Sequence, residues 1–184
     1  MNLKPIKYKS IQIKKEYHPI LKSRIIAQEL FTRQNNVEHI LEEYCINNVH
    51  SNLKTEHFYE LIVTAMVTKN MHALSYLIKK IDGFKGEIFL YQLGHTQHYL
   101  LMKSLYLSAT DTKKNCLKIM DDFNIQGVAE SYKEFLTLFY IIAQYNVADH
   151  FEKVELLAQY THLAEKLKYP IFDEVYIKNY NFKD

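Results

Sequence analysis

The sequence predicts an all-α fold built from stacked antiparallel helical hairpins. Apolar residues recur at spacings of three and four through most of the 184-residue chain, which is the pattern of amphipathic helices. Only 4 Gly and 3 Pro interrupt this pattern, which disfavours a β architecture with many turns. Strand and helix patterns do not alternate, so nothing indicates a parallel sheet. The apolar share of 48% and the charged share of 24% are ordinary for a globular protein.

Two parts are predicted along the chain. Residues 1–16 form a basic arm, in which five lysines precede the first acid, Glu16. We interpret this arm either as a solvated tail or as a segment that contacts an acidic partner. Residues 17–184 form a single helical-repeat domain, which can bury roughly 70% of its unfolded surface without the help of a disulfide or a metal.

In the first half of the chain, the apolar spacing predicts helices over residues 18–34, 37–47, 56–68 and 71–81. Thr55 suits the N-cap of the third helix, because its hydroxyl can accept a hydrogen bond from an otherwise unpaired helix N–H. The pair Asp82-Gly83 is expected to end the fourth helix.

A central helix is predicted from Gly86 to Ala109. Apolar residues lie on almost every side of this segment, which indicates burial on most of its surface. The polar run from Gln92 to His98 lies in its middle, and such a run excludes a membrane span. We therefore expect a helix packed on several sides that keeps one polar strip for another purpose.

The last part of the chain is predicted to form helices over 112–123, 128–145 and 150–167. Asp111 is the expected N-cap of the first of these, and Pro170 ends the last, because the residue before a proline resists the helical conformation. The aromatic-rich tail from Ile171 to Asp184 is expected to pack back as a helix or a strand. Together the predicted helices form four hairpins, at roughly 18–50, 56–82, 86–124 and 128–168.

The hairpins carry a resemblance to a known repeat. The first helices of the last three begin near residues 56, 86 and 128, and tetratricopeptide units repeat about every 34 residues. DHFEKV, Asp149 to Val154, resembles the turn and second-helix opening of such a unit, and LGHTQHY, Leu93 to Tyr99, resembles part of its first helix. In style the chain is similar to the degenerate helical repeats of peptide-pheromone receptors from low-GC Gram-positive bacteria and their phages.

This resemblance implies a right-handed tetratricopeptide-like array that binds a peptide; an irregular bundle is the alternative arrangement. Those receptors usually carry a DNA-binding helix-turn-helix ahead of the repeats, for which the short basic arm leaves no room. We therefore do not expect direct control of transcription.

Charge and cysteine usage narrow the possible partners. The formal net charge is only +2, and of 23 cationic residues only Arg24 and Arg33 are arginine, so nucleic acid is not an expected partner. Cys45 and Cys116 lie in apolar helical patterns without metal-ligand spacing, which predicts packed thiols and a reducing compartment. The N-terminus shows no apolar signal region, so we expect a cytoplasmic protein, without a cofactor and without a membrane anchor.

Two constellations offer alternative chemistry. His95 and His98 lie three residues apart on one helix face and could bind a metal, but a metal site needs a third and a fourth ligand. We therefore interpret them as hydrogen-bonded, partly buried histidines and expect no metal site. Arg33 and His39 fit the loose spacing of all-helical ribonucleases of defence and toxin systems. In that resemblance the arginine binds phosphate and the histidine acts on the ribose hydroxyl. No glycine-rich phosphate loop and no GxSxG motif is present.

Polar strips on the first helices of the last three hairpins are the candidate binding site. Members of each strip are three or four residues apart, so each strip follows one helix face. We expect stacked hairpins to set the strips side by side on a concave surface, where they bind an extended peptide; the alternative is that they are only the solvent edge of each helix. The strips are Glu60, Thr64 and Thr68, then Gln92, Thr96, Tyr99 and Lys103, then Lys133, Thr137, Tyr140 and Gln144.

The sequence thus predicts a peptide- or protein-binding regulatory module that uses a concave polar groove. One alternative is the helical ribonuclease that uses Arg33 and His39. The other is a structural protein that forms homo-oligomers through a tyrosine-rich interface, since tyrosine is enriched in interfaces and the chain contains 15.

Overall fold

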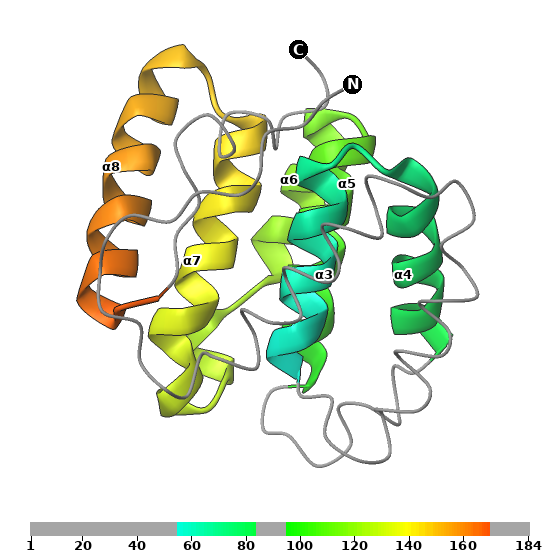
Figure 1. Cartoon of the computed structure of the whole chain (residues 1–184), viewed down its shortest axis with the longest axis horizontal. Coiled ribbons are helices and arrows are strands. Elements are labelled where there is room, and N and C mark those ends of the chain that lie inside the picture. Colours follow the sequence, from blue (N-terminus) through cyan, green and yellow to red (C-terminus); the bar gives the residue numbers. More distant parts are fainter. Residues whose placement is uncertain (1–54, 84–94, 170–184) are drawn as a thin grey trace.

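The computed structural model describes residues 55–83 and 95–169, and this part of the chain is all-α, as predicted (Figure 1). The predicted helices over 18–34 and 37–47, the start of the central helix, the basic arm and the aromatic tail lie outside the described residues. The observed elements are α3 (Thr55–Val67), α4 (Met71–Gly83), α5 (His95–Thr110), α6 (Lys113–Asp122), the 3₁₀ helix η2 (Ile125–Gly127), α7 (Glu130–Val147) and α8 (His150–Leu167).

The helices pair as the hairpins α3–α4, α5–α6 and α7–α8, and the partners in α3–α4 and α7–α8 run antiparallel (Figure 1). Helix α5 packs against α3, α4, α6 and α7, and α8 packs against α7 at one side of the molecule. The prediction of a central helix enclosed on several sides is therefore confirmed over the described residues of that helix.

The N-terminus of α6 begins one residue later than predicted. Thr112, not Asp111, is the N-cap, and its hydroxyl oxygen accepts the backbone N–H of Asn115 at 3.4 Å. The Asp111 carboxylate instead accepts the N–H of Thr112 at 2.6 Å and the side-chain amide of Asn115 at 3.1 Å. Both side chains therefore accept hydrogen bonds at the start of α6. The sequence pattern alone does not show which of the two is the N-cap.

Both ends of α8 agree with the prediction of residues 150–167. At the start, the Asp149 carboxylate accepts the N–H of Glu152 at 2.9 Å, and the Glu152 carboxylate accepts the N–H of Asp149 at 3.0 Å. This reciprocal capping box pairs two backbone donors that a helix start otherwise leaves open. At the end, Lys168 adopts a left-handed conformation (φ 52°), so the helix stops before Pro170 restricts the chain.

Because of this capping box, Asp149→Ala is expected to lower the free energy of unfolding by about 1 kcal/mol. Urea denaturation followed by circular dichroism measures the change. Asp122→Ala, at an exposed position in the last turn of α6, is the control and is expected to change stability by less than about 0.5 kcal/mol. Equal effects of the two substitutions would contradict the capping role.

An aromatic cluster joins three parts of the core. The Phe139 ring on α7 stacks on Tyr59 of α3, with centroids 4.9 Å apart, and meets Phe135 at 5.1 Å. Tyr169, which follows α8 and is 1% exposed, packs edge-on against both phenylalanines. The core is therefore continuous from α3 to the residues beyond α8.

Small polar groups are buried where α5 meets α7. The amide nitrogen of Asn146 donates to the Ser108 hydroxyl at 3.0 Å, and that hydroxyl donates to the Leu105 carbonyl at 2.7 Å. Cys116 lies on the buried face of α6 and its thiol points to the Ser104 carbonyl of α5, 3.5 Å away, so it is a packed thiol as predicted. Cys45 lies outside the described residues.

Within the described helices, none is long and apolar enough to cross a membrane.

Candidate functional site

Two of the three residues of the first predicted strip, on α3, lie inside the protein, and the third, Thr68, is partly buried. Glu60 and Thr64 are both 0% exposed. The Thr64 hydroxyl donates to the Glu60 carbonyl at 2.7 Å, and the Thr68 hydroxyl donates to the Thr64 carbonyl at 2.9 Å. Threonine can satisfy its hydroxyl within its own helix in this way, so its polarity does not imply exposure. The expectation that this strip lines an open groove does not hold for Glu60 and Thr64.

The second strip, on α5, binds the neighbouring helix. The Tyr99 hydroxyl donates to one carboxylate oxygen of Asp82 on α4 at 2.6 Å, and Lys103 lies 3.7 Å from the other. Burial, helped by the hydrogen bond and the charge of Asp82, raises the pKa of Tyr99 to about 12. These two side chains therefore connect α5 to α4. Thr96 is exposed in the first turn of α5, and Gln92 lies outside the described residues.

The third strip, on α7, divides into two halves. In the first half, Lys133 pairs with Glu130 at 2.7 Å and donates to the Gln126 side chain at 2.7 Å, while the Thr137 hydroxyl donates to the Lys133 carbonyl. In the second half, Tyr140 and Gln144 line a groove between α6 and α8. Only these two of the predicted residues belong to this groove.

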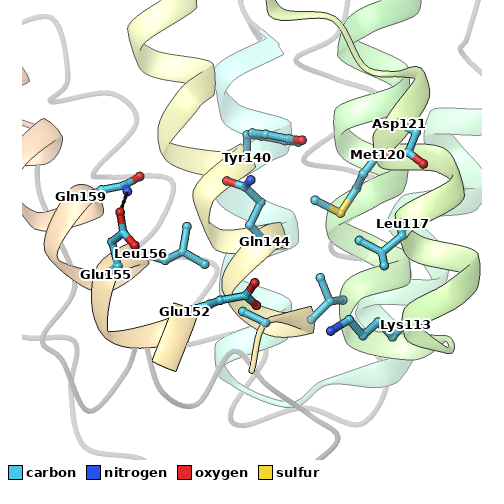
Figure 2. Close-up of a pocket in the computed structure, with 12 residues that line it drawn as sticks. Lys113, Leu117, Met120, Asp121, Tyr140, Gln144, Glu152, Glu155, Leu156 and Gln159 are labelled. Carbon is cyan, nitrogen blue, oxygen red and sulfur yellow. Dashed lines mark hydrogen bonds between the residues drawn. The ribbon is translucent and has the colours of Figure 1, made fainter. Parts of the chain in front are cut away.

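The groove has a volume of about 460 Å³, with α7 as its floor and with α6 and α8 as its walls (Figure 2). Figure 2 shows side chains from all three helices extending toward the space between the walls. The lining residues are Lys113, Leu117, Met120 and Asp121 of α6, Tyr140, Gln144 and Val147 of α7, Ala148 of the connecting turn, and Glu152, Glu155, Leu156 and Gln159 of α8.

Tyr140 is half-buried at the α6 side of the floor. Its ring packs on Phe123, which follows α6, with centroids 5.2 Å apart. Burial raises the pKa of the Tyr140 hydroxyl, and the nearby negative charge of Asp121 raises it further. The hydroxyl therefore stays protonated at neutral pH and can both donate and accept a hydrogen bond.

Several polar groups of the groove have unused hydrogen-bonding capacity. Within residues 55–83 and 95–169, the Tyr140 hydroxyl and the Gln144 amide make no hydrogen bond, and Asp121 and Lys113 form no ion pair. Beside them lie the apolar side chains of Leu117, which is 38% exposed, and Leu156. An apolar surface with a few convergent polar groups is the usual composition of a binding pocket.

Sequence reasoning missed the groove walls, which come from second helices of the hairpins. One signal was available. The buried residues of α6 are Cys116 and Met120. Leu117 directly follows Cys116, so it points to a different side of the helix and is an additional apolar residue outside the buried face. Such an extra apolar position on an amphipathic helix indicates a second contact surface.

Among the described side chains, which do not include that of His95, no group of three potential metal ligands occurs. His98 is buried, and its Nδ1 shares a hydrogen bond with the Tyr59 hydroxyl, 3.0 Å away, while that hydroxyl also lies 3.3 Å from the His98 carbonyl. The Tyr132 ring packs edge-on against the imidazole at 5.6 Å. Burial lowers the pKa of His98 to about 4, so the ring is neutral at pH 7. Arg33 and His39 of the ribonuclease alternative lie outside the described residues.

Comparisons of this chain with family models, with curated proteins and with solved structures found no match. The resemblance to tetratricopeptide receptors therefore stays a prediction.

Proposed function

We propose that this chain is a binding module and that the groove between α6 and α8 accepts a peptide segment of a regulatory partner. The observation that carries the proposal is the combination, in one groove, of apolar walls with the uncommitted hydroxyl of Tyr140 and amide of Gln144. A peptide offers both apolar side chains and main-chain donors and acceptors, so it matches both features.

The size of the groove agrees with this proposal. Pockets that bury most of a small ligand span about 300–1,000 Å³, and the volume here, about 460 Å³, accommodates a few side chains of a peptide rather than a whole domain. The succession of the hairpins α5–α6 and α7–α8, with the first helices α5 and α7 packed together, supports a tetratricopeptide-like arrangement. In this proposal the protein acts as a regulator in the cytoplasm.

The proposal is tested with random peptides displayed on phage and selected against the full chain. Selected peptides are synthesised, and their dissociation constants are measured by fluorescence anisotropy. Gln144→Ala and Tyr140→Phe are each expected to weaken binding about tenfold, because a peptide group is left without its hydrogen-bond partner.

Tyr106→Phe is the matched control. It removes a hydroxyl of the same kind from α5, outside the groove, and is expected to leave the dissociation constant unchanged. Circular dichroism verifies that each variant is folded. If folded Gln144→Ala and Tyr140→Phe proteins bind every selected peptide as the unaltered chain does, the groove is not the binding site.

A further inference from the structure

The walls of the groove are acidic, although the whole chain is slightly basic. Three carboxylates line the groove, from Asp121, Glu152 and Glu155, against the single ammonium group of Lys113. The formal charge of the chain is +2, so the sign of the charge at the groove is opposite to that of the molecule. A groove lined mainly by one sign of charge attracts the opposite sign.

The carboxylates lie on both walls, so a ligand in the groove meets them from two sides. Asp121 is on α6, beside Tyr140, and Glu152 and Glu155 are on α8 (Figure 2). Their existing contacts leave them able to bind more. Glu155 accepts only one hydrogen bond, from Gln159 at 3.2 Å, and in the capping box the Asp149 N–H uses one carboxylate oxygen of Glu152. Asp121 forms no ion pair among the described residues.

Apolar side chains lie between these charges. Leu117 and Met120 belong to the α6 wall, Leu156 to the α8 wall and Val147 to the end of the floor. A ligand therefore meets apolar contacts and negative charges on the same surface. A segment in which lysines or arginines alternate with aliphatic residues has the complementary composition, whereas an acidic segment or a phosphate backbone meets repulsion.

We propose, building on the peptide-binding function above, that the groove selects a cationic peptide segment with aliphatic anchor residues. The aliphatic side chains contact Leu117 and Leu156, and the basic side chains pair with Asp121 and Glu155 across the groove. The main chain of the segment uses Tyr140 and Gln144.

The test compares two fluorescent peptides with the same leucine positions, one with lysine at every other position and one with glutamate there. At low salt the lysine peptide is expected to bind the full chain at least about tenfold more tightly, and the difference is expected to shrink as salt screens the charges. Asp121→Asn is expected to weaken lysine-peptide binding about two- to fivefold, as the loss of one exposed ion pair does.

Asp122→Asn is the matched control, since it removes the same charge one residue further along α6 and outside the groove lining. A loss with Asp121→Asn and not with Asp122→Asn supports the proposal. If both peptides bind equally and Gln144→Ala weakens both, the peptide-binding function stands and the preference for cations is wrong. If neither peptide binds, the preference for cations is wrong, and the peptides selected on phage still decide the peptide-binding function. If neither Gln144→Ala nor Asp121→Asn changes the binding of either peptide, both proposals fail.

Discussion

Phe139→Ala is expected to lower the free energy of unfolding by about 3–5 kcal/mol. This loss is large, because the whole free energy of unfolding of a typical domain is only about 5–15 kcal/mol. The Phe139 side chain is 2% exposed and contacts the rings of Tyr59, Phe135 and Tyr169. Its removal leaves a cavity where α3, α7 and the residues after α8 meet. Three separate segments surround that cavity, so they cannot all move inward to close it.

Phe151→Ala is the control for this prediction, because the chemical change is identical and Phe151 on α8 is 86% exposed. We expect Phe151→Ala to change the free energy of unfolding by less than about 0.5 kcal/mol. Urea denaturation of both variants, followed by circular dichroism, gives the comparison. A loss below about 1 kcal/mol for Phe139→Ala would show that the cluster does not connect the core as described.

The stability of the protein is expected to fall as pH decreases from 6.5 to 4, and His98 is expected to account for up to about 3 kcal/mol of this fall. Burial lowers the pKa of His98 from 6.5 to about 4 in the folded state. Between these two values the unfolded chain binds a proton at this residue and the folded chain does not, so acid favours unfolding. The contribution is fully present above pH 6.5 and is lost as pH falls through this interval.

His98→Asn tests the assignment. The asparagine amide can donate or accept a hydrogen bond with the Tyr59 hydroxyl in place of Nδ1, but it does not titrate. Urea denaturation at a series of pH values is expected to give a smaller acid loss for His98→Asn than for the unaltered chain. His162→Asn, which removes an exposed imidazole from α8, is expected to keep the full loss.

A second measurement keeps this prediction testable if His98→Asn does not fold. In the unaltered chain, the His98 ring resonances in NMR spectra are expected to show no protonation above about pH 5. Titration of His98 near pH 6.5 would contradict its burial as a neutral ring.

The helices of the described region were predictable because each carries its own local signals. Residues 150–167 were predicted with both boundaries, since the apolar spacing begins after Asp149 and Pro170 prevents continuation. The start of α6 was wrong by one residue, because Asp111 and Thr112 are both good caps and local sequence does not rank them. The burial of α5 on several sides followed from its apolar residues lying all around the helix.

The candidate site was only partly predictable. A spacing of three or four residues places polar side chains on one helix face, but it does not indicate what that face meets. Tyr99 and Lys103 share a face, and the structure directs that face to Asp82 on α4. Glu60 and Thr64 share a face that is completely enclosed. Of the predicted residues in the described part of the chain, only Tyr140 and Gln144 line the groove, and the walls beside them come from helices that carried no predicted site residue.

The sequence by itself determined that the described chain is helical, which of its helices is central and, to within about two residues in most cases, where its helices begin and end. Hydrogen bonds within a helix and the period of its apolar residues are local properties. The direction of each polar strip was decided only when the hairpins packed. A carboxylate such as Asp82 engages a tyrosine 17 residues away, and α6 and α8 become the walls of one groove, because packing brings distant segments together. The acidic character of that groove likewise arises only in the folded protein. Packing there brings the carboxylate of Asp121 on α6 to the same groove as those of Glu152 and Glu155 on α8.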